Sequence, residues 1–258
     1  SRRQRQMCIR DRCLNDNYSY LIHDEISNTV AIVDPSEFIP CDTIISKNYK
    51  KLDFILNTHH HYDHVGGNEE LKKKYNSKVL GFENDKNRIP QIDTVLKDNQ
   101  EFKIGTLNFT TIFIPGHTRG HVAFYFKKER VVFSGDTLFS LGCGRVFEGT
   151  YKQMFQSLNK LKNLPGETKV YCGHEYTFKN LEFCLKFNPN NNFLKKKKDD
   201  IKLSLKNKKP TIPSTIADEI KANIFFRVND PDVKKAINLE NSSDIEIFTK
   251  LRDLKDNF

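Results

Sequence analysis

The sequence lacks any apolar run approaching the roughly 20 residues that a membrane-spanning helix requires. No secretory hydrophobic segment follows the basic start of the chain either, so we expect a cytoplasmic protein with no membrane partner. The six cysteines form no CxxC pair and no spacing typical of a disulfide framework. In a chain of 258 residues, which is long enough for a large core, we therefore expect reduced and packed thiols.

The first twelve residues, SRRQRQMCIRDR, resemble a translated sequencing adapter, so we exclude residues 1–12 from the expected fold. They carry five Arg and one Asp, and without them the formal net charge falls from +9 to +5. Charge alone therefore gives no reason to expect a nucleic-acid partner, although a modest positive field could attract a small anionic substrate. The basic run 195–198 is interpreted as a solvated helix face.

Short β-type runs alternate with helical patterns over the first two thirds of the chain, which predicts an α/β or α+β layered domain. The expected strands are 18–22, 29–33, 54–56, 79–81, 107–114, 121–126, 131–133 and 169–171, and the expected helices are 69–75 and 153–161. Helical periodicity then dominates at 181–187, 195–205, 213–223 and 244–256. This change predicts a domain boundary near residues 172–178.

The most informative segment is THHHYDH at residues 58–64, which directly follows an apolar strand. It places His59, His61, Asp63 and His64 at a strand end, where side chains can converge without disturbing the hydrogen-bonded ladder. Imidazole and carboxylate ligands without thiolates suit Zn²⁺, Fe²⁺ or Mn²⁺ and are not typical of a structural zinc finger. A chance cluster or a tag is disfavoured because Asp and Tyr interrupt the histidines.

Three later segments each end an apolar strand with another candidate ligand. His117 lies in IPGHT, Asp136 in SGDT and His174 in CGHEYT. One such segment alone would be weak evidence, because a single His after a strand is more often structural. Together with the THHHYDH segment, these three form one ordered series of four, and such a series is strong evidence for a metal centre.

This ordered series resembles the metallo-β-lactamase superfamily. The resemblance implies an α+β fold, an αββα sandwich followed by a smaller α-helical C-terminal domain. It also implies two divalent metal ions, with zinc as the first expectation and iron or manganese as alternatives. The implied ligands are His59, His61 and His117 for the first metal, Asp63, His64 and His174 for the second, and Asp136 as the bridge between them. His60 and His121 are expected to be packing or supporting residues.

Two metals that share a water can lower its pKa from about 15.7 to about 7, so that a metal-bridging hydroxide can attack a carbonyl at neutral pH. Asp63 and Asp136 are the expected catalytic carboxylates, with Asp136 orienting the nucleophile. A thioester suits this chemistry, because a thiolate with a parent pKa of about 8.5 leaves with little help from a general acid.

Four segments resemble hydroxyacylglutathione hydrolases, the glyoxalase II family: 142–150, 172–177, 211–215 and 251–258. The resemblance implies hydrolysis of S-D-lactoylglutathione to glutathione and D-lactate, the second step of methylglyoxal detoxification. It implies a metallo-β-lactamase domain at 13–175 and a substrate-binding domain at 176–258. The implied glutathione contacts are Arg145, Tyr176, Arg252 and Lys255. Some family members have Lys in place of Arg145 and Tyr in place of Phe147, so Phe147 lacks that hydroxyl and is expected to contribute its backbone.

The alternative enzyme is a glutathione persulfide dioxygenase of the same fold, which does not need a complete second metal site. The presence of Asp63, His64 and His174 favours the hydrolase. A secreted β-lactamase, a nucleic-acid hydrolase with an inserted domain and an inactive metal-binding module are weaker alternatives. We expect a monomer.

Overall fold

The computed structural model describes residues 9–258, and the side chains from Cys13 onward. The prediction that residues 1–12 are foreign to the protein falls mainly on residues 1–8, which lie outside the described part. The described chain divides into two compact units. The first unit contains residues 9–113 and 119–135, and the second contains residues 114–118 and 136–258.

The first sheet of the first unit has six strands in sequence order. They are β1 (Ile9–Cys13), β2 (Asn17–Asp24), β3 (Thr29–Val33), β4 (Phe54–Leu56), β5 (Lys78–Phe82) and β6 (Thr94–Leu96). Strands β1 to β3 are antiparallel, whereas β3 to β6 are parallel. The register aligns Ile32, Ile55 and Val79 across three neighbouring strands, so the β-branched side chains form one apolar row.

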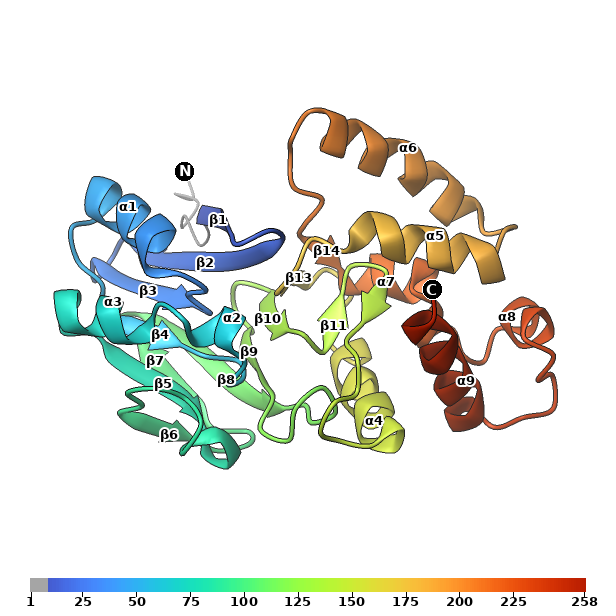
Figure 1. Ribbon diagram of the computed structural model, residues 1–258, viewed down its shortest axis with the longest axis horizontal. Helices are drawn as coiled ribbons and strands as arrows, with labels where there is room; N and C mark the ends of the chain where they lie inside the picture. The colour runs from blue at the N-terminus through green and yellow to red at the C-terminus, as the bar shows by residue number, and fades with distance from the viewer. Residues whose placement is uncertain (1–8) are drawn as a thin grey trace. The chain divides into compact units, whose positions relative to one another are not determined.

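Helices α1 (Phe38–Asn48) and α3 (Asn68–Tyr75) cover one face of this sheet (Figure 1). Ile45 of α1 and Leu71 of α3 belong to the same buried cluster as Ile32 and Ile55. The apolar side chains of both helices therefore meet the row from the strands, and the sheet is closed to solvent on this side.

A second sheet in the same unit is an antiparallel meander. It contains β7 (Glu101–Ile104), β8 (Leu107–Phe113), β9 (Val122–Phe126) and β10 (Val131–Gly135). Aromatic rings join it to the first sheet: the centroids of Tyr20 and Phe133 are 5.5 Å apart, and those of Phe82 and Phe113 are 4.6 Å apart. The two sheets thus enclose an aromatic core within this unit.

The second unit is mainly helical and contains two small β elements. The β elements are the hairpin β11 (Leu138–Phe139) with β12 (Gly142–Cys143), and the pair β13 (Lys169–Cys172) with β14 (Ser214–Thr215). The helices are α4 (Tyr151–Lys162), α5 (Thr177–Phe187), α6 (Asn192–Lys206), α7 (Ile216–Ala222), α8 (Pro231–Ala236) and α9 (Asp244–Asp256). Helices α5 and α6 pack against each other (Figure 1), and α4 begins with a capping box between Thr150 and Gln153.

Most of the elements expected from the sequence are present, and α9 has the predicted bounds. The helix expected at 213–223 begins later, at Ile216, because Ser214 pairs with Val170 in the β13–β14 ladder. Thr215 then caps the helix by accepting a hydrogen bond from the amide of Asp218. We did not predict α1, α8, β6 or β7, which are short or weakly patterned. Residues 9–12, which we excluded, form most of β1.

Five cysteines are free and buried, as expected; Cys8 lies outside the described residues. Within residues 9–258, no helix combines the length and the apolar character needed to cross a membrane.

The two sheets of the first unit are also joined through Asp24, the last residue of β2. Its carboxylate accepts a hydrogen bond from Ser27 Oγ at 2.5 Å. It also accepts one at 2.6 Å from the amide of Thr106, which lies in the turn between β7 and β8. Burial raises the pKa of this carboxyl, but these bonds and one from Ile26 outweigh burial and lower its pKa from 3.8 to about 2.

We expect Asp24→Asn to lower the free energy of unfolding at neutral pH by about 2 kcal/mol, because the shifted pKa measures the preference of the native state for the carboxylate. The contribution of Asp24 to the free energy of unfolding is complete above the pKa of an unfolded Asp, near 4, and is lost as the pH falls towards the native pKa of about 2. Urea denaturation between pH 2 and pH 7 measures it, with the exposed Glu25→Gln as the control. Equal pH dependence in the wild type and Asp24→Asn would contradict the assignment.

Candidate metal centre and substrate-binding residues

The THHHYDH segment lies in the loop that follows β4 and continues into the short helix α2 (Tyr62–Val65). His59 and His64 are buried, whereas His61 and Asp63 are half-buried. His59 Nε2 lies 3.2 Å from His61 Nδ1, so these two rings converge. His64 Nε2 lies 3.6 Å from a carboxylate oxygen of Asp63, so this pair converges as well. His59 and His61 are the ligands expected from this segment for the first metal, and Asp63 and His64 are those expected for the second.

A buried carboxylate that we did not predict, Asp34, organises this loop. Its Oδ1 accepts a hydrogen bond from the Thr58 amide at 2.8 Å, and its Oδ2 accepts one from Thr58 Oγ1 at 2.7 Å. The same Oδ2 lies 3.0 Å from His64 Nδ1. This contact orients the imidazole of His64 and makes Nε2 the nitrogen available to a metal.

Asp34, His59 and His64 have potential ligand atoms within 4.8 Å of one another, so Asp34 could be mistaken for a ligand. Its oxygens already accept hydrogen bonds from Thr58, which indicates a supporting role. In the sequence Asp34 precedes Pro35 at a strand end, a pattern that is typical of a turn and does not indicate a metal site.

Three further contacts support the same loop. Asn17 donates to the backbone oxygen of Asp63 at 3.0 Å and to its carboxylate at 2.9 Å. His121 is buried and its ring is stacked on His59, with centroids 4.6 Å apart and planes at 18°. His60 Nδ1 lies 3.3 Å from the buried carboxylate of Asp85. His60 and His121 therefore occupy supporting positions, as expected, and Asn17 is an addition.

The second unit holds its own cluster of candidate ligands: His117, Asp136 and His174. All three are buried. Asp136 Oδ2 lies 3.2 Å from His174 Nε2 and 3.6 Å from His117 Nε2. The two imidazoles thus direct the same type of nitrogen at one carboxylate, a set of donors that fits a divalent cation such as Zn²⁺.

The ring orientations of both histidines are fixed by neighbours. His117 Nδ1 lies 2.9 Å from the carbonyl oxygen of Arg145, to which it can donate, so Nε2 is the nitrogen directed towards Asp136. The ring of Tyr176 is stacked on His174 at 4.7 Å and 3°. Gly144 allows this arrangement, because a Cβ there would lie 1.9 Å from the Asp136 carbonyl oxygen.

The expected substrate residues of the second unit differ in exposure. Arg145 is exposed and pairs with Asp256, with 3.2 Å between Nε and Oδ1. Phe147 is 62% exposed and meets the ring of His117 edge-on at 5.2 Å. Lys255 lies over the rings of Phe183 and Phe258 at 5.1 and 4.9 Å. Burial lowers the pKa of Lys255 to about 8, so the ammonium form still dominates at neutral pH.

Arg252 is only 3% exposed, unlike the other cationic candidates. It donates to the Cys143 carbonyl oxygen at 2.7 Å and to Asp256 Oδ1 at 2.9 Å, and its guanidinium lies 5.3 Å from the centre of the Phe225 ring. These contacts give Arg252 a structural role in joining α9 to the segment after β12. A contact between Arg252 and glutathione stays a prediction.

Two family models together span nearly all of the chain. The model described as "Metallo-beta-lactamase superfamily" matches residues 15–174, and "Hydroxyacylglutathione hydrolase C-terminus" matches residues 175–258. The hydroxyacylglutathione hydrolase of Pelagibacter ubique is 51% identical over 96% of this chain and 98% of its own length.

The chain belongs to the hydroxyacylglutathione hydrolase family of the metallo-β-lactamase superfamily.

Other comparisons agree. The hydroxyacylglutathione hydrolase of Methylococcus capsulatus is 42% identical over 95% of this chain and 96% of its own length. Among solved structures, ETHE1 from Myxococcus xanthus has a TM-score of 0.69 at 23% identity and covers 96% of this chain and 91% of its own. BLEG-1 B3 metallo-β-lactamase has a TM-score of 0.65 at 22% identity, and the match covers 85% of this chain and 99% of its own. At these identities the two structures show the fold alone.

These findings confirm the predicted family and the metallo-β-lactamase fold with its helical C-terminal region. They identify the protein as a metal-dependent hydrolase, and the His and Asp clusters support the binding of a divalent metal.

Replacing Arg252 by Met should lower the free energy of unfolding by about 3 kcal/mol, because it leaves the Cys143 carbonyl and Asp256 without their buried donor. Arg145→Met removes an exposed ion pair and should cost less than about 1 kcal/mol. Urea denaturation of both variants beside the wild type measures the difference. Equal losses in the two variants would contradict the structural role of Arg252.

Proposed function

We propose that the protein hydrolyses the thioester S-D-lactoylglutathione to glutathione and D-lactate, the second step of methylglyoxal detoxification. The observation that carries this proposal is the similarity to named hydroxyacylglutathione hydrolases over nearly the full length of both chains. The C-terminal family match at 175–258 supports it further, because it includes Tyr176, Arg252 and Lys255.

We also propose that two divalent metals bind at the residues expected from the sequence. The ligands would be His59, His61 and His117 for one metal, Asp63, His64 and His174 for the other, and Asp136 between them. The donor chemistry fits, because every ligand is an imidazole or a carboxylate and most are buried. TTHA1623, a structural relative at 27% identity with a TM-score of 0.54, covers 65% of this chain and 91% of its own and was solved in a di-iron-bound form. That precedent supports two metals, and we propose zinc as the first choice before iron or manganese.

When bound, such metals supply hydroxide at neutral pH and stabilise the oxyanion that forms at the thioester carbonyl. The protein's own residues supply the geometry. Asn17 holds the carboxylate of Asp63, and Asp34 holds the ring of His64. Asp63 and Asp136 are the carboxylates that would orient the attacking oxygen.

Glutathione carries two carboxylates, so cationic side chains can bind it. Arg145 is exposed and offers a guanidinium that can grip a carboxylate through two hydrogen bonds. Lys255 adds a point charge. Tyr176 lies against His174 and could contact both the substrate and the metal centre. Phe147 could contribute its backbone groups. The leaving thiolate needs little help from a general acid.

Several further expectations remain proposals of the same kind. They are a metallo-β-lactamase domain at 13–175, a substrate-binding domain at 176–258, a monomer, and action in a cytoplasm that contains glutathione. No nucleic-acid partner is proposed.

The direct test is hydrolysis of S-D-lactoylglutathione by the purified protein together with metal analysis. We expect thiol release with about two metals per chain. In Asp136→Asn, kcat should fall at least about a hundredfold and the metal content should drop, because a carboxylate ligand is lost. The exposed Asp199→Asn on α6 is the matched control and should retain full activity.

A folded, metal-loaded protein that does not release thiol from the thioester would contradict the proposed substrate. Oxygen consumption with glutathione persulfide would then distinguish the dioxygenase that the sequence leaves as the alternative.

A further inference from the structure

The backbone around the turn of the β11–β12 hairpin is held by side chains from the C-terminal helices. This hairpin lies between Asp136 and Arg145, the proposed bridging ligand and a proposed substrate residue. Four backbone carbonyls and one amide between residues 140 and 143 take part. The partners are Asn180 at the Ser140 oxygen, Glu219 at the Leu141 amide, Cys184 at the Leu141 oxygen, Asn223 at the Gly142 oxygen and Arg252 at the Cys143 oxygen.

Glu219 and Asn223, at the end of α7, form the centre of this set. Both are fully buried, at 0% exposure. Glu219 Oε2 accepts from the Leu141 amide at 2.8 Å and from Asn223 Nδ2 at 2.9 Å. Asn223 Nδ2 also donates to the Gly142 oxygen at 3.0 Å. The carboxylate therefore fixes one hairpin residue directly and the next one through Asn223.

The hairpin needs this support because Leu141 has a φ of +60°, which is unfavourable for a side chain larger than glycine. Its amide and carbonyl both point to side-chain partners, Glu219 and Cys184. Without Glu219, the Leu141 amide would be a buried donor with no acceptor, which is costly.

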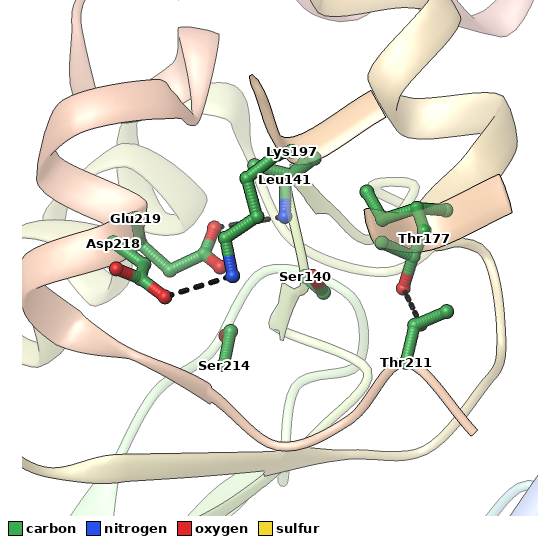
Figure 2. Close-up of a pocket in the computed structure, with 9 residues that line it drawn as sticks. Ser140, Leu141, Thr177, Lys197, Thr211, Ser214, Asp218 and Glu219 are labelled. Carbon is green, nitrogen blue, oxygen red and sulfur yellow. Dashed lines mark hydrogen bonds and ion pairs between the residues drawn. The ribbon is translucent and has the colours of Figure 1, made fainter. Parts of the chain in front are cut away.

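Glu219 also borders a small cavity (Figure 2). The cavity has a volume of about 20 Å³, enough for one water molecule. The residues that line it include Ser140, Thr177, Ser214 and Glu219.

The ionisable groups around Glu219 come from three helices. They are Asp218 on α7, Lys197 on α6 and Cys184 on α5. Lys197 pairs with Asp218 at 3.0 Å, as Figure 2 shows, so its charge is already balanced. Burial raises the pKa of Glu219 to about 7, although the hydrogen bonds from Ser214, Asn223 and Leu141 act to lower it.

We propose that Glu219 is a positioning residue for the thioester hydrolase reaction, because it fixes the hairpin from which Arg145 is presented to the substrate. This proposal rests on the proposed function for its kinetic consequences. Among the described residues, the hydrogen-bond partners of Glu219 include neither the proposed ligands nor the expected substrate contacts. It should therefore affect substrate binding more than the chemical step or the metal content.

The test compares Glu219→Ala, Glu219→Gln and the exposed control Glu182→Gln on α5. In Glu219→Ala we expect KM to rise about five- to tenfold, with kcat within about twofold and metal content unchanged. Glutamine has an oxygen that can accept from the Leu141 amide, so Glu219→Gln should restore KM. The control should match the wild type.

Hydrogen exchange at the Leu141 amide gives a readout that is independent of activity. Exchange should be at least about tenfold faster in Glu219→Ala and close to the wild-type rate in Glu219→Gln. Folded Glu219→Ala with unchanged KM and unchanged exchange would overturn the proposal. If Glu219→Ala does not fold, Glu219→Gln decides, and a folded Glu219→Gln whose KM and Leu141 exchange rate both differ strongly from those of the wild type would overturn the proposal. A wild type that is inert on the thioester would refute the proposed function, while the exchange rates would still decide whether Glu219 holds the hairpin.

Discussion

The orientation of imidazole rings is the constraint on which this metal centre depends. A histidine ligates through one ring nitrogen, and the hydrogen bond at the other nitrogen decides which one and in which direction. Here Asp34 meets Nδ1 of His64, and the carbonyl oxygen of Arg145 meets Nδ1 of His117. Neither partner is a proposed ligand, yet each sets the geometry of one. The strands and helices that hold Asp34 and the Arg145 carbonyl in place therefore also set the orientation of His64 and His117.

The support differs between the two units. In the first unit it comes from strand ends of the parallel sheet: Asp34 follows β3, the histidine loop follows β4, and Thr58 joins them. In the second unit, a two-strand hairpin connects Asp136 to Arg145, and helices bind that hairpin through buried side chains. The helical region thus has a structural role in addition to its proposed contacts with glutathione.

The sequence predicted the strand-end positions of the candidate ligands well, because a local motif and the strand before it are both visible in a short window. It could not reveal Asp34, Asn17 or Glu219. Each of these residues acts through a partner that is distant in sequence, such as Thr58 for Asp34 and Leu141 for Glu219. No periodicity or spacing marks such a pair in a single chain.

Burial explains a second difference. Arg252 and Lys255 are close together on one helix, and the sequence offered the same interpretation for both. The structure separates them: the guanidinium of Arg252 is committed to Cys143 and Asp256, whereas Lys255 is half-buried between aromatic rings. Residue type indicates what a side chain can bind, and the packing around it determines which atoms remain accessible.

Anomalous diffraction from crystals grown with zinc would test the proposed metal centre most directly. The account predicts two zinc positions, one bound by His59, His61 and His117 and the other by Asp63, His64 and His174, with Asp136 bound to both. Asp34 should remain bonded to Thr58 and His64. A single zinc, or a zinc bound by Asp34 in place of Asp63, would contradict the account.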